Sequence, residues 1–269
     1  MFFNSSFSDF MKKRTLNIQM AGESNRGLRR SRNEDSFLVC RPGTAYAFAC
    51  VADGIGSHSD GQLASTICCR DFLNAALRYD FENGNPELFL KENCGEINRK
   101  IFDRNYREFR NRPMGCTAVA AVFAREYVVI GNVGDSRFYE FLPGREQPLQ
   151  QITIDHHPDD ETLEMLSARY NINKESLKVR ILLHSIGIRH RAKPDIFRLK
   201  TVPGAIYLLC SDGLSGMVSE ARIAEIVDQY QDDMRKLSSA LMREALICGG
   251  KDNVTVVSVK YDGVDHAFA

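Results

Sequence analysis

The sequence has no net charge, no long apolar run and no C-x-x-C cysteine pair. Its 269 residues carry 35 Lys and Arg against 35 Asp and Glu, which argues against a nucleic-acid coat or a polybasic membrane binder. No apolar stretch approaches the ~20 residues that a membrane-spanning helix needs. The hydrophobic content of 43% is that of a globular protein. We therefore expect neither a nucleic-acid nor a membrane partner.

The eight cysteines show none of the patterns of a disulfide framework. None stands in a C-x-x-C pair, and Cys68 and Cys69 are adjacent, which is poor geometry for a disulfide. Cys50, Cys116 and Cys210 lie in apolar stretches, where a reduced thiol packs as a small hydrophobic group. Reduced cysteines predict a cytoplasmic protein.

Residues 15–263 are predicted to form one α+β domain. Residues 1–14 are interpreted as a leader that could be disordered, since polar residues interrupt their apolar character. Apolar patterns predict strands at 16–21, 36–40, 45–52, 117–124, 127–132, 137–142, 149–154, 196–200, 206–210 and 253–260. Helical spacing predicts helices at 61–79, 86–101, 161–168, 174–182, 220–229 and 233–247. Consecutive strands joined by tight turns favour antiparallel sheets over a doubly wound parallel sheet.

Aspartate stands at the ends of five predicted strands: Asp35, Asp53, Asp135, Asp212 and Asp252. Each of them alone fits a turn, because the aspartate side chain bonds nearby backbone N–H groups. Asp53 and Asp212, however, each end a nearly continuous apolar strand and precede a glycine. A charge so close to the core needs a partner, and glycine allows a ligand to approach the backbone.

Converging carboxylates without neighbouring His or Cys suit Mg²⁺ or Mn²⁺ better than zinc. Two such ions can deprotonate a water and bind the oxygens of a phosphate. Arg30 could make bidentate hydrogen bonds to phosphate. Arg29 and Arg32 stand beside it, so the three arginines fit a solvated basic surface equally well.

Other catalytic motifs are absent from the sequence. No cysteine has an arginine six positions later, as a cysteine-dependent phosphatase loop requires. The segment 249–252 lacks the Ser or Thr of a phosphate loop, and Gly54 and Gly56 lack the third glycine of a dinucleotide fingerprint. There is no H-E-x-x-H motif, and His156 and His157 are interpreted as a loop or helix-entry feature.

Seven segments resemble, in the same order, the motifs of the metal-dependent type 2C protein serine/threonine phosphatases: GLRRSRNEDS, VADGIGSH, MGCTAV, VGDSR, ITIDHH, LLCSDGLSGMV and GGKDNVTVV. The resemblance extends from about residue 21 to residue 260 and is strongest to the compact bacterial branch. It implies a four-layer α-β-β-α sandwich, in which two antiparallel sheets are flanked by helices. Residues 156–195 correspond to the family's flap beside the active site.

By motif position the resemblance assigns metal binding to seven residues: Glu34, Asp35, Asp53, Gly54, Asp135, Asp212 and Asp252. Asp53 would bridge two Mn²⁺ or Mg²⁺ ions, and Gly54 would add its carbonyl oxygen. Asp212 and Asp252 would bind one ion of the pair. A third ion would be held by Asp135 together with Asp212. In the Glu34-Asp35 pair, Asp35 is the favoured ligand.

The implied activity is hydrolysis of phosphoserine and phosphothreonine in proteins by a metal-activated water. Arg30 would bind the phosphate, and Asp53, Asp212 and Asp252 would complete the catalytic set. Phosphorylated proteins are then the substrates, and a Ser/Thr kinase is the expected opposing partner. A phosphoprotein-binding regulator with weak catalysis and a hydrolase of small phosphate esters remain alternatives.

The general acid is left open by the sequence. Many eukaryotic members of the family carry histidine directly after the Asp-Gly pair, where this chain has Ile55. His58 stands nearby and fits either a proton donor or a turn-stabilising hydrogen bonder.

Overall fold

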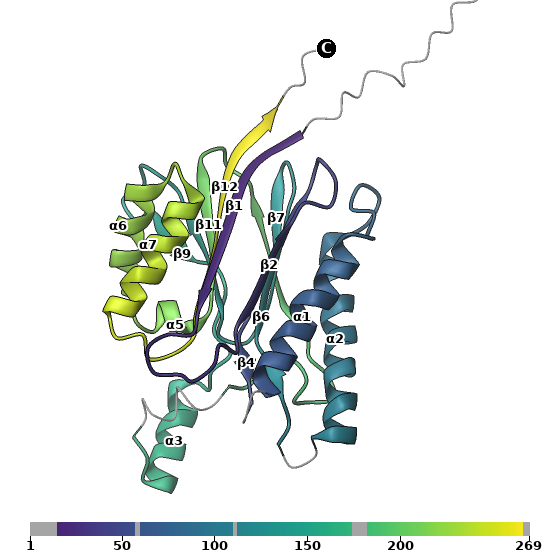
Figure 1. The fold of residues 1–269 in the computed structure, drawn as a ribbon, viewed down its shortest axis with the longest axis vertical. Helices are drawn as coiled ribbons and strands as arrows, with labels where there is room; N and C mark the ends of the chain where they lie inside the picture. Colours follow the sequence, from purple (N-terminus) through teal and green to yellow (C-terminus); the bar gives the residue numbers. More distant parts are fainter. Residues whose placement is uncertain (1–14, 57–59, 110–111, 174–181, 266–269) are drawn as a thin grey trace, which may run out of the picture.

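The computed structural model describes residues 15–56, 60–109, 112–173 and 182–265 (Figure 1). The predicted leader, residues 1–14, lies outside these ranges, as do His58 and all but the last residue of the helix predicted at 174–182. No helix in the described ranges is long and apolar enough to cross a membrane.

Two five-stranded antiparallel sheets form the centre of the fold. One sheet has the order β1 (Thr15–Asn25), β12 (Val254–Asp265), β11 (Ala205–Cys210), β8 (Arg137–Phe141) and β9 (Leu149–Gln151). The other has the order β10 (Asp195–Lys200), β7 (Tyr127–Val133), β6 (Ala118–Phe123), β3 (Ala47–Ala52) and β2 (Ser36–Cys40). A separate short pair joins β4 (Gly54–Ile55) to β5 (Gly115–Cys116).

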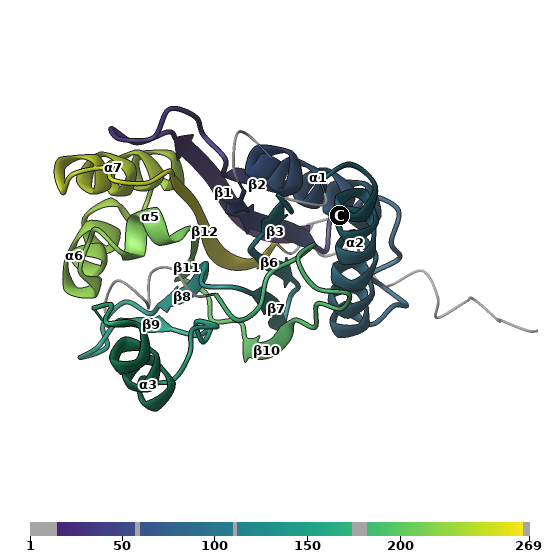
Figure 2. The same cartoon turned by 90° about the horizontal axis from the view of Figure 1, so that it is seen from below.

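Helices cover the outer face of each sheet (Figures 1 and 2). The helices α1 (Asp60–Ala76) and α2 (Pro86–Glu108) pack on the sheet that contains β3. The helices α6 (Glu220–Tyr230) and α7 (Met234–Ile247), with the short α5 (Asp212–Ser215), lie on the sheet that contains β12. Helix α3 (Asp160–Tyr170) stands apart from both layers. The layers therefore run α-β-β-α, as the resemblance implied.

The central strands are buried on both faces, which explains their continuous apolar sequences. In β3, Ala47, Ala49 and Val51 point into the core between the two sheets, while Phe48 and Cys50 pack under α1 and α2. Strands of this kind carry no alternation of polar and apolar residues. Three apolar cores result, one between the sheets and one beneath each helical layer.

Capping residues set where several helices begin. The Asn85 side chain accepts hydrogen bonds from the backbone N–H groups of Glu87 and Leu88, and Pro86 follows as the first helical residue of α2. Ser219 and Asp233 cap α6 and α7 in the same way. These caps satisfy N–H groups that have no partner within the helix.

Apart from the helix predicted at 174–182, which falls almost wholly outside the described residues, the predicted elements are present with changes at their ends. β1 continues to Asn25, α2 to Glu108 and β12 to Asp265, whereas β9 ends three residues early at Gln151. The prediction missed the two-residue pair β4 and β5 and the single turn α5, which are too short to show a period. Asp212 is accordingly the first residue of α5 and not the last residue of a strand.

Candidate functional site

Strand register brings four of the five aspartates to one end of the sandwich. Ser36 pairs with Ala52, so Asp35, just before β2, and Asp53, just after β3, lie at the same edge of their sheet. In the other sheet Cys210 pairs with Val256, which places Asp212 and Asp252 at a common edge. These carboxylates converge because antiparallel neighbours end and begin side by side.

A cavity of about 260 Å³ opens at this end. Acidic side chains from both sheets line it: Glu34, Asp53, Asp135, Asp212 and Asp252. Arg30, Gly54, Thr117 and Asn253 belong to the same wall. Of the seven residues that the sequence assigned to metal, six therefore line one cavity, and Asp35 does not.

Asp53 is fixed by the neighbouring strands. Its backbone N–H donates to Thr117 Oγ1 at 2.9 Å, and its carbonyl oxygen accepts from the Thr117 N–H at 2.8 Å. The Thr117 hydroxyl also lies 2.7 Å from the hydroxyl of Ser136, the residue after Asp135. A short hydrogen-bonded chain thus connects the backbone of Asp53 to the turn that carries Asp135.

Gly54 allows two backbone segments to meet behind the cavity. A Cβ atom at this position would collide with the carbonyl groups of Gly61 and Glu34. Position 54 must therefore be glycine if it is to pair with Cys116 and to keep its carbonyl group beside Asp53.

Replacing Gly54 by alanine should lower the free energy of unfolding by about 1–3 kcal/mol, because the added methyl group has no space. Gly95→Ala is a matched control, since a Cβ there meets nothing within 4 Å. Gly95 lies inside α2, so its replacement should stabilise the protein by about 0.5–1 kcal/mol. Urea unfolding measures both values, and equal effects of the two substitutions would contradict this account of Gly54.

Asp35 lies beneath the cavity and not on its wall. Its Oδ2 atom accepts hydrogen bonds from the hydroxyls of Ser211 and Thr255, both at 2.7 Å, while the side chain is 7% exposed. Burial raises the pKa of Asp35 to about 6, against the effect of these two donors. The preceding residue, Glu34, faces the cavity instead.

The remaining acids repel one another in the absence of a cation. Burial, followed by the negative charges of Asp35 and Asp212, raises the pKa of Asp53 well above its ordinary value. Burial and the charge of Asp135 raise the pKa of Asp212 to about 7. Burial also raises the pKa of Asp135, and the neighbouring His157 opposes that shift. A cation among these groups would remove the repulsion.

Arg30 stands at the mouth of the cavity and pairs with one of the acids. Its Nη2 atom lies 2.6 Å from Oδ2 of Asp252, and both side chains are partly exposed. The other oxygen of Asp252 accepts from the backbone N–H of Asn253 at 2.8 Å. The guanidinium is therefore held where an anion entering the cavity would meet it.

The donor set fits a hard divalent cation. Oδ1 of Asp35 and Oδ1 of Asp212 are buried and have no hydrogen-bond partner among the described residues. Carboxylate and carbonyl oxygens are the ligands that Mg²⁺ and Mn²⁺ prefer. Within the described part of the chain, no three acidic, His or Cys side chains already surround one point as metal ligands.

The sequence prediction missed several residues that support the site. Thr117 and Ser136 hold Asp53 beside Asp135, and Asn253 binds the loop that carries Arg30. His157 was interpreted as a loop feature, yet its Nε2 atom lies 3.3 Å from Asp135 Oδ2. A signal existed for all four, because Thr117, Ser136, Asn253 and His157 stand inside the family motifs MGCTAV, VGDSR, GGKDNVTVV and ITIDHH.

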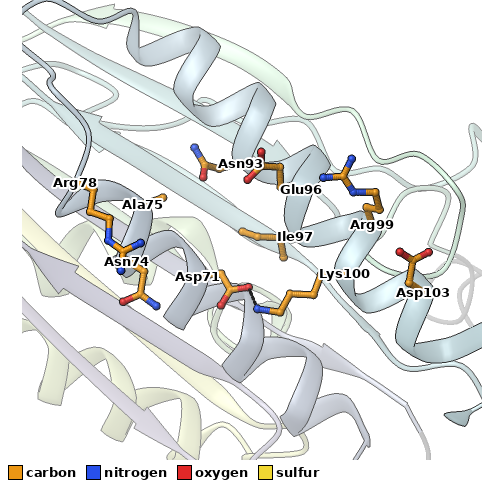
Figure 3. Close-up of a pocket in the computed structure, with 10 residues that line it drawn as sticks. All are labelled: Asp71, Asn74, Ala75, Arg78, Asn93, Glu96, Ile97, Arg99, Lys100 and Asp103. Atoms are coloured by element: carbon orange, nitrogen blue, oxygen red, sulfur yellow. Dashed lines mark hydrogen bonds and ion pairs between the residues drawn. The ribbon is translucent and has the colours of Figure 1, made fainter. Parts of the chain in front are cut away.

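A larger cavity, of about 460 Å³, lies between α1 and α2 (Figure 3). Its side chains carry both charges, with Arg78 on one side, Arg99 on the other, and an Asp71–Lys100 ion pair across one end. These residues come from the two helices and the turn after α1, none of which contributes an acid to the first cavity. We assign no chemistry to this groove.

Known proteins match both the sequence and the fold. The family model for protein phosphatase 2C matches residues 22–248. The serine/threonine phosphatase stp of Listeria monocytogenes is 32% identical over 244 residues, which cover 89% of this chain and 94% of that protein. The serine/threonine protein phosphatase PstP of Mycobacterium tuberculosis is also 32% identical, over 96% of this chain and 47% of that protein.

Solved structures agree with these matches. The catalytic domain of PstP in complex with two manganese ions superimposes with a TM-score of 0.75 at 30% identity, covering 94% of this chain and all of that one. Stp1 from Staphylococcus aureus gives a TM-score of 0.76 at 27% identity, covering 92% and 96%. The protein is a phosphatase, an enzyme that hydrolyses phosphoric monoesters. It belongs to the protein phosphatase 2C family.

Proposed function

We propose that this chain hydrolyses phosphoserine and phosphothreonine in proteins, with two Mn²⁺ or Mg²⁺ ions bound in the acidic cavity. The observation that carries the proposal is the meeting of five acidic residues from both sheets around one space, with Arg30 at its mouth. The relatives named as serine/threonine phosphatases, and the manganese-bound PstP structure, support the substrate class and the metals.

The ligands for the metals are proposed from the same wall. Asp53 and the carbonyl oxygen of Gly54 would lie at the centre, since the charges of Asp35, Asp212, Asp135 and Asp252 all act on the buried Asp53 carboxyl. Asp212 and Asp252 would hold one ion, and Asp135 with Asp212 a third. Glu34, which faces the cavity, replaces Asp35 as the favoured ligand of the first acidic motif. The ions would lower the pKa of a bound water and neutralise charge on the phosphate oxygens.

The chain's own residues orient the substrate. Arg30 exchanges its ion pair with Asp252 for bidentate hydrogen bonds to the phosphate, which places phosphorus over the acidic wall. Asp35, fixed by Ser211 and Thr255, holds negative charge beneath Asp53. Thr117 keeps the backbone of Asp53 in place while the phosphate enters and leaves.

The cellular setting follows from the same proposal. A phosphoprotein phosphatase requires a kinase that makes its substrates, so a Ser/Thr kinase is the opposing partner. All eight cysteines are free, and six of them are buried. Free thiols persist in a reducing compartment, which supports a cytoplasmic location.

The experiment that tests the function is phosphate release from a phosphothreonine peptide by the purified chain. The enzyme is first treated with a chelator and then assayed with Mn²⁺, Mg²⁺ or neither. We expect turnover only with added metal, and faster turnover of the peptide than of p-nitrophenyl phosphate at equal concentration. Full activity in the chelator would contradict the metal site, and preference for the small ester would favour the alternative of a small-ester hydrolase.

A further inference from the structure

A cluster of arginines lies on the loop between β1 and β2, beside the acidic cavity. Seven residues, 26–32, contain four arginines, although the whole chain has no net charge. We call three of them, with one lysine of the neighbouring loop, the basic rim: Arg26, Arg29, Arg32 and Lys251. All four are exposed. Arg30, the fourth arginine, is the proposed phosphate ligand and is not counted in the rim.

Hydrogen bonds hold the backbone of this loop in one shape. The Asn253 side-chain amide donates to the carbonyl oxygens of Arg26 and Arg32, both at 2.8 Å, and so joins the two ends of the loop. Leu28 N–H donates to the Gly250 carbonyl oxygen at 2.7 Å. The arginine side chains therefore extend from a fixed backbone.

The basic rim lies next to the residues that form the wall of the acidic cavity. Arg30, which belongs to that wall, directly follows Arg29. Asn253, also a wall residue, follows Lys251 by two positions and donates a hydrogen bond to the carbonyl oxygen of Arg26 in the loop. Asn253 also connects Arg32 to Glu34, another wall residue, because its amide donates to the Arg32 carbonyl oxygen and its Oδ1 atom accepts from the Glu34 backbone N–H at 2.8 Å. A positively charged edge thus adjoins a negatively charged cavity.

The rim has cationic groups to spare. Arg29, Arg32 and Lys251 form no ion pair with any described residue, whereas Arg30 is paired with Asp252. Three unpaired cations beside one phosphate site match a dianion better than a single carboxylate. Arginine in particular binds phosphate through two parallel hydrogen bonds.

We propose that the basic rim binds a second phosphorylated residue of the substrate, close in sequence to the residue being dephosphorylated, so that the enzyme prefers multiply phosphorylated segments. This inference rests on the proposed function. An extended peptide advances about 3.3–3.6 Å per residue. The three rim arginines stand one to four positions from Arg30 on a loop whose two ends are joined by Asn253, so we place the second phosphate a few residues from the first.

Peptides that share one phosphothreonine test the preference. The residue three positions away is phosphonomethylalanine, a phosphoserine analogue that cannot be hydrolysed, or glutamate, or glutamine. We expect kcat/KM with the analogue to exceed that with glutamine by roughly five- to tenfold, as two exposed ion pairs allow, with glutamate in between. The ratio should fall as ionic strength rises.

The double variant Arg29→Gln/Arg32→Gln should bring the ratio of analogue to glutamine peptide close to one. Arg78→Gln/Arg99→Gln, which removes two exposed arginines from the groove between α1 and α2, is the matched control and should keep the ratio (Figure 3). Equal rates with the three peptides, or an equal loss with all of them in the rim variant, would overturn the inference. Inactivity of the wild type with Mn²⁺ on every peptide would instead contradict the proposed function.

Discussion

Asp212→Asn should lower phosphate release by at least about a hundredfold, since it removes a carboxylate that we propose as a metal ligand at the centre of the cavity. The same substitution should leave the metal-free protein as stable as the wild type or more stable. Burial and the charges of Asp135 and Asp252 oppose ionisation of Asp212, and asparagine carries no charge to repel. Activity and stability should therefore change in opposite directions.

The measurement combines phosphate release in Mn²⁺ with thermal unfolding in a chelator. Asp228→Asn is the matched control, because Asp228 is an exposed aspartate of α6 that lies outside the family motifs and does not line the acidic cavity. It should alter neither quantity. If Asp212→Asn lost activity because the protein unfolds in the chelator, Asp212 would be a structural residue and its place in the metal site would be wrong.

Mn²⁺ should raise the melting temperature by about 5–10 °C at a hundred times its Kd, and more at about pH 8 than at about pH 5. The pKa values of Asp35, about 6, and Asp212, about 7, stand above the ordinary value of 3.8. Between pH ~4 and ~7 the folded metal-free protein retains protons that the unfolded chain has released. The metal-free protein therefore loses stability as pH rises through this window.

The metal reverses this loss, because it binds the ionised carboxylates and competes with their protons. Differential scanning fluorimetry across the pH range, with Mn²⁺ and with chelator, follows both curves. Asp53→Asn should abolish the difference between them. A shift that stays the same at every pH would mean that Mn²⁺ binds groups other than the buried aspartates.

Long strands and amphipathic helices of this fold are predictable from the sequence. β3 and β6 are six-residue apolar runs, and α7 has an N-cap followed by regular apolar spacing, so each element shows its own pattern. The short pair β4 and β5 and the turn α5 have no such pattern. Contacts between residues distant in sequence hold them in place. Thr117 accepts a hydrogen bond from the backbone of Asp53 just before β4, and Ser211, just before α5, accepts one from the backbone of Thr255.

The candidate site was predictable as a set of aspartates but not as an arrangement. Register explains why Asp35 lies beside Asp53 and Asp212 beside Asp252, whereas Asp53 and Asp212 meet at one cavity only because the two sheets pack against each other. The sequence could not show that Asp35 turns inward to Ser211 and Thr255 while Glu34 faces the cavity, since two adjacent carboxylates look alike in the chain. The contact of His157 with Asp135 likewise depends on how residues 155–157 pass the turn at Gly134.

The most direct test of the acidic cavity as a metal centre is anomalous X-ray diffraction from crystals of this protein grown with Mn²⁺. Two manganese peaks should lie in the cavity lined by Asp53, Asp212 and Asp252, with Asp53 between them and each ion roughly 2.0–2.2 Å from carboxylate oxygens, a typical distance for small divalent ions. Manganese peaks only outside this cavity, in crystals saturated with the metal, would contradict the central claim.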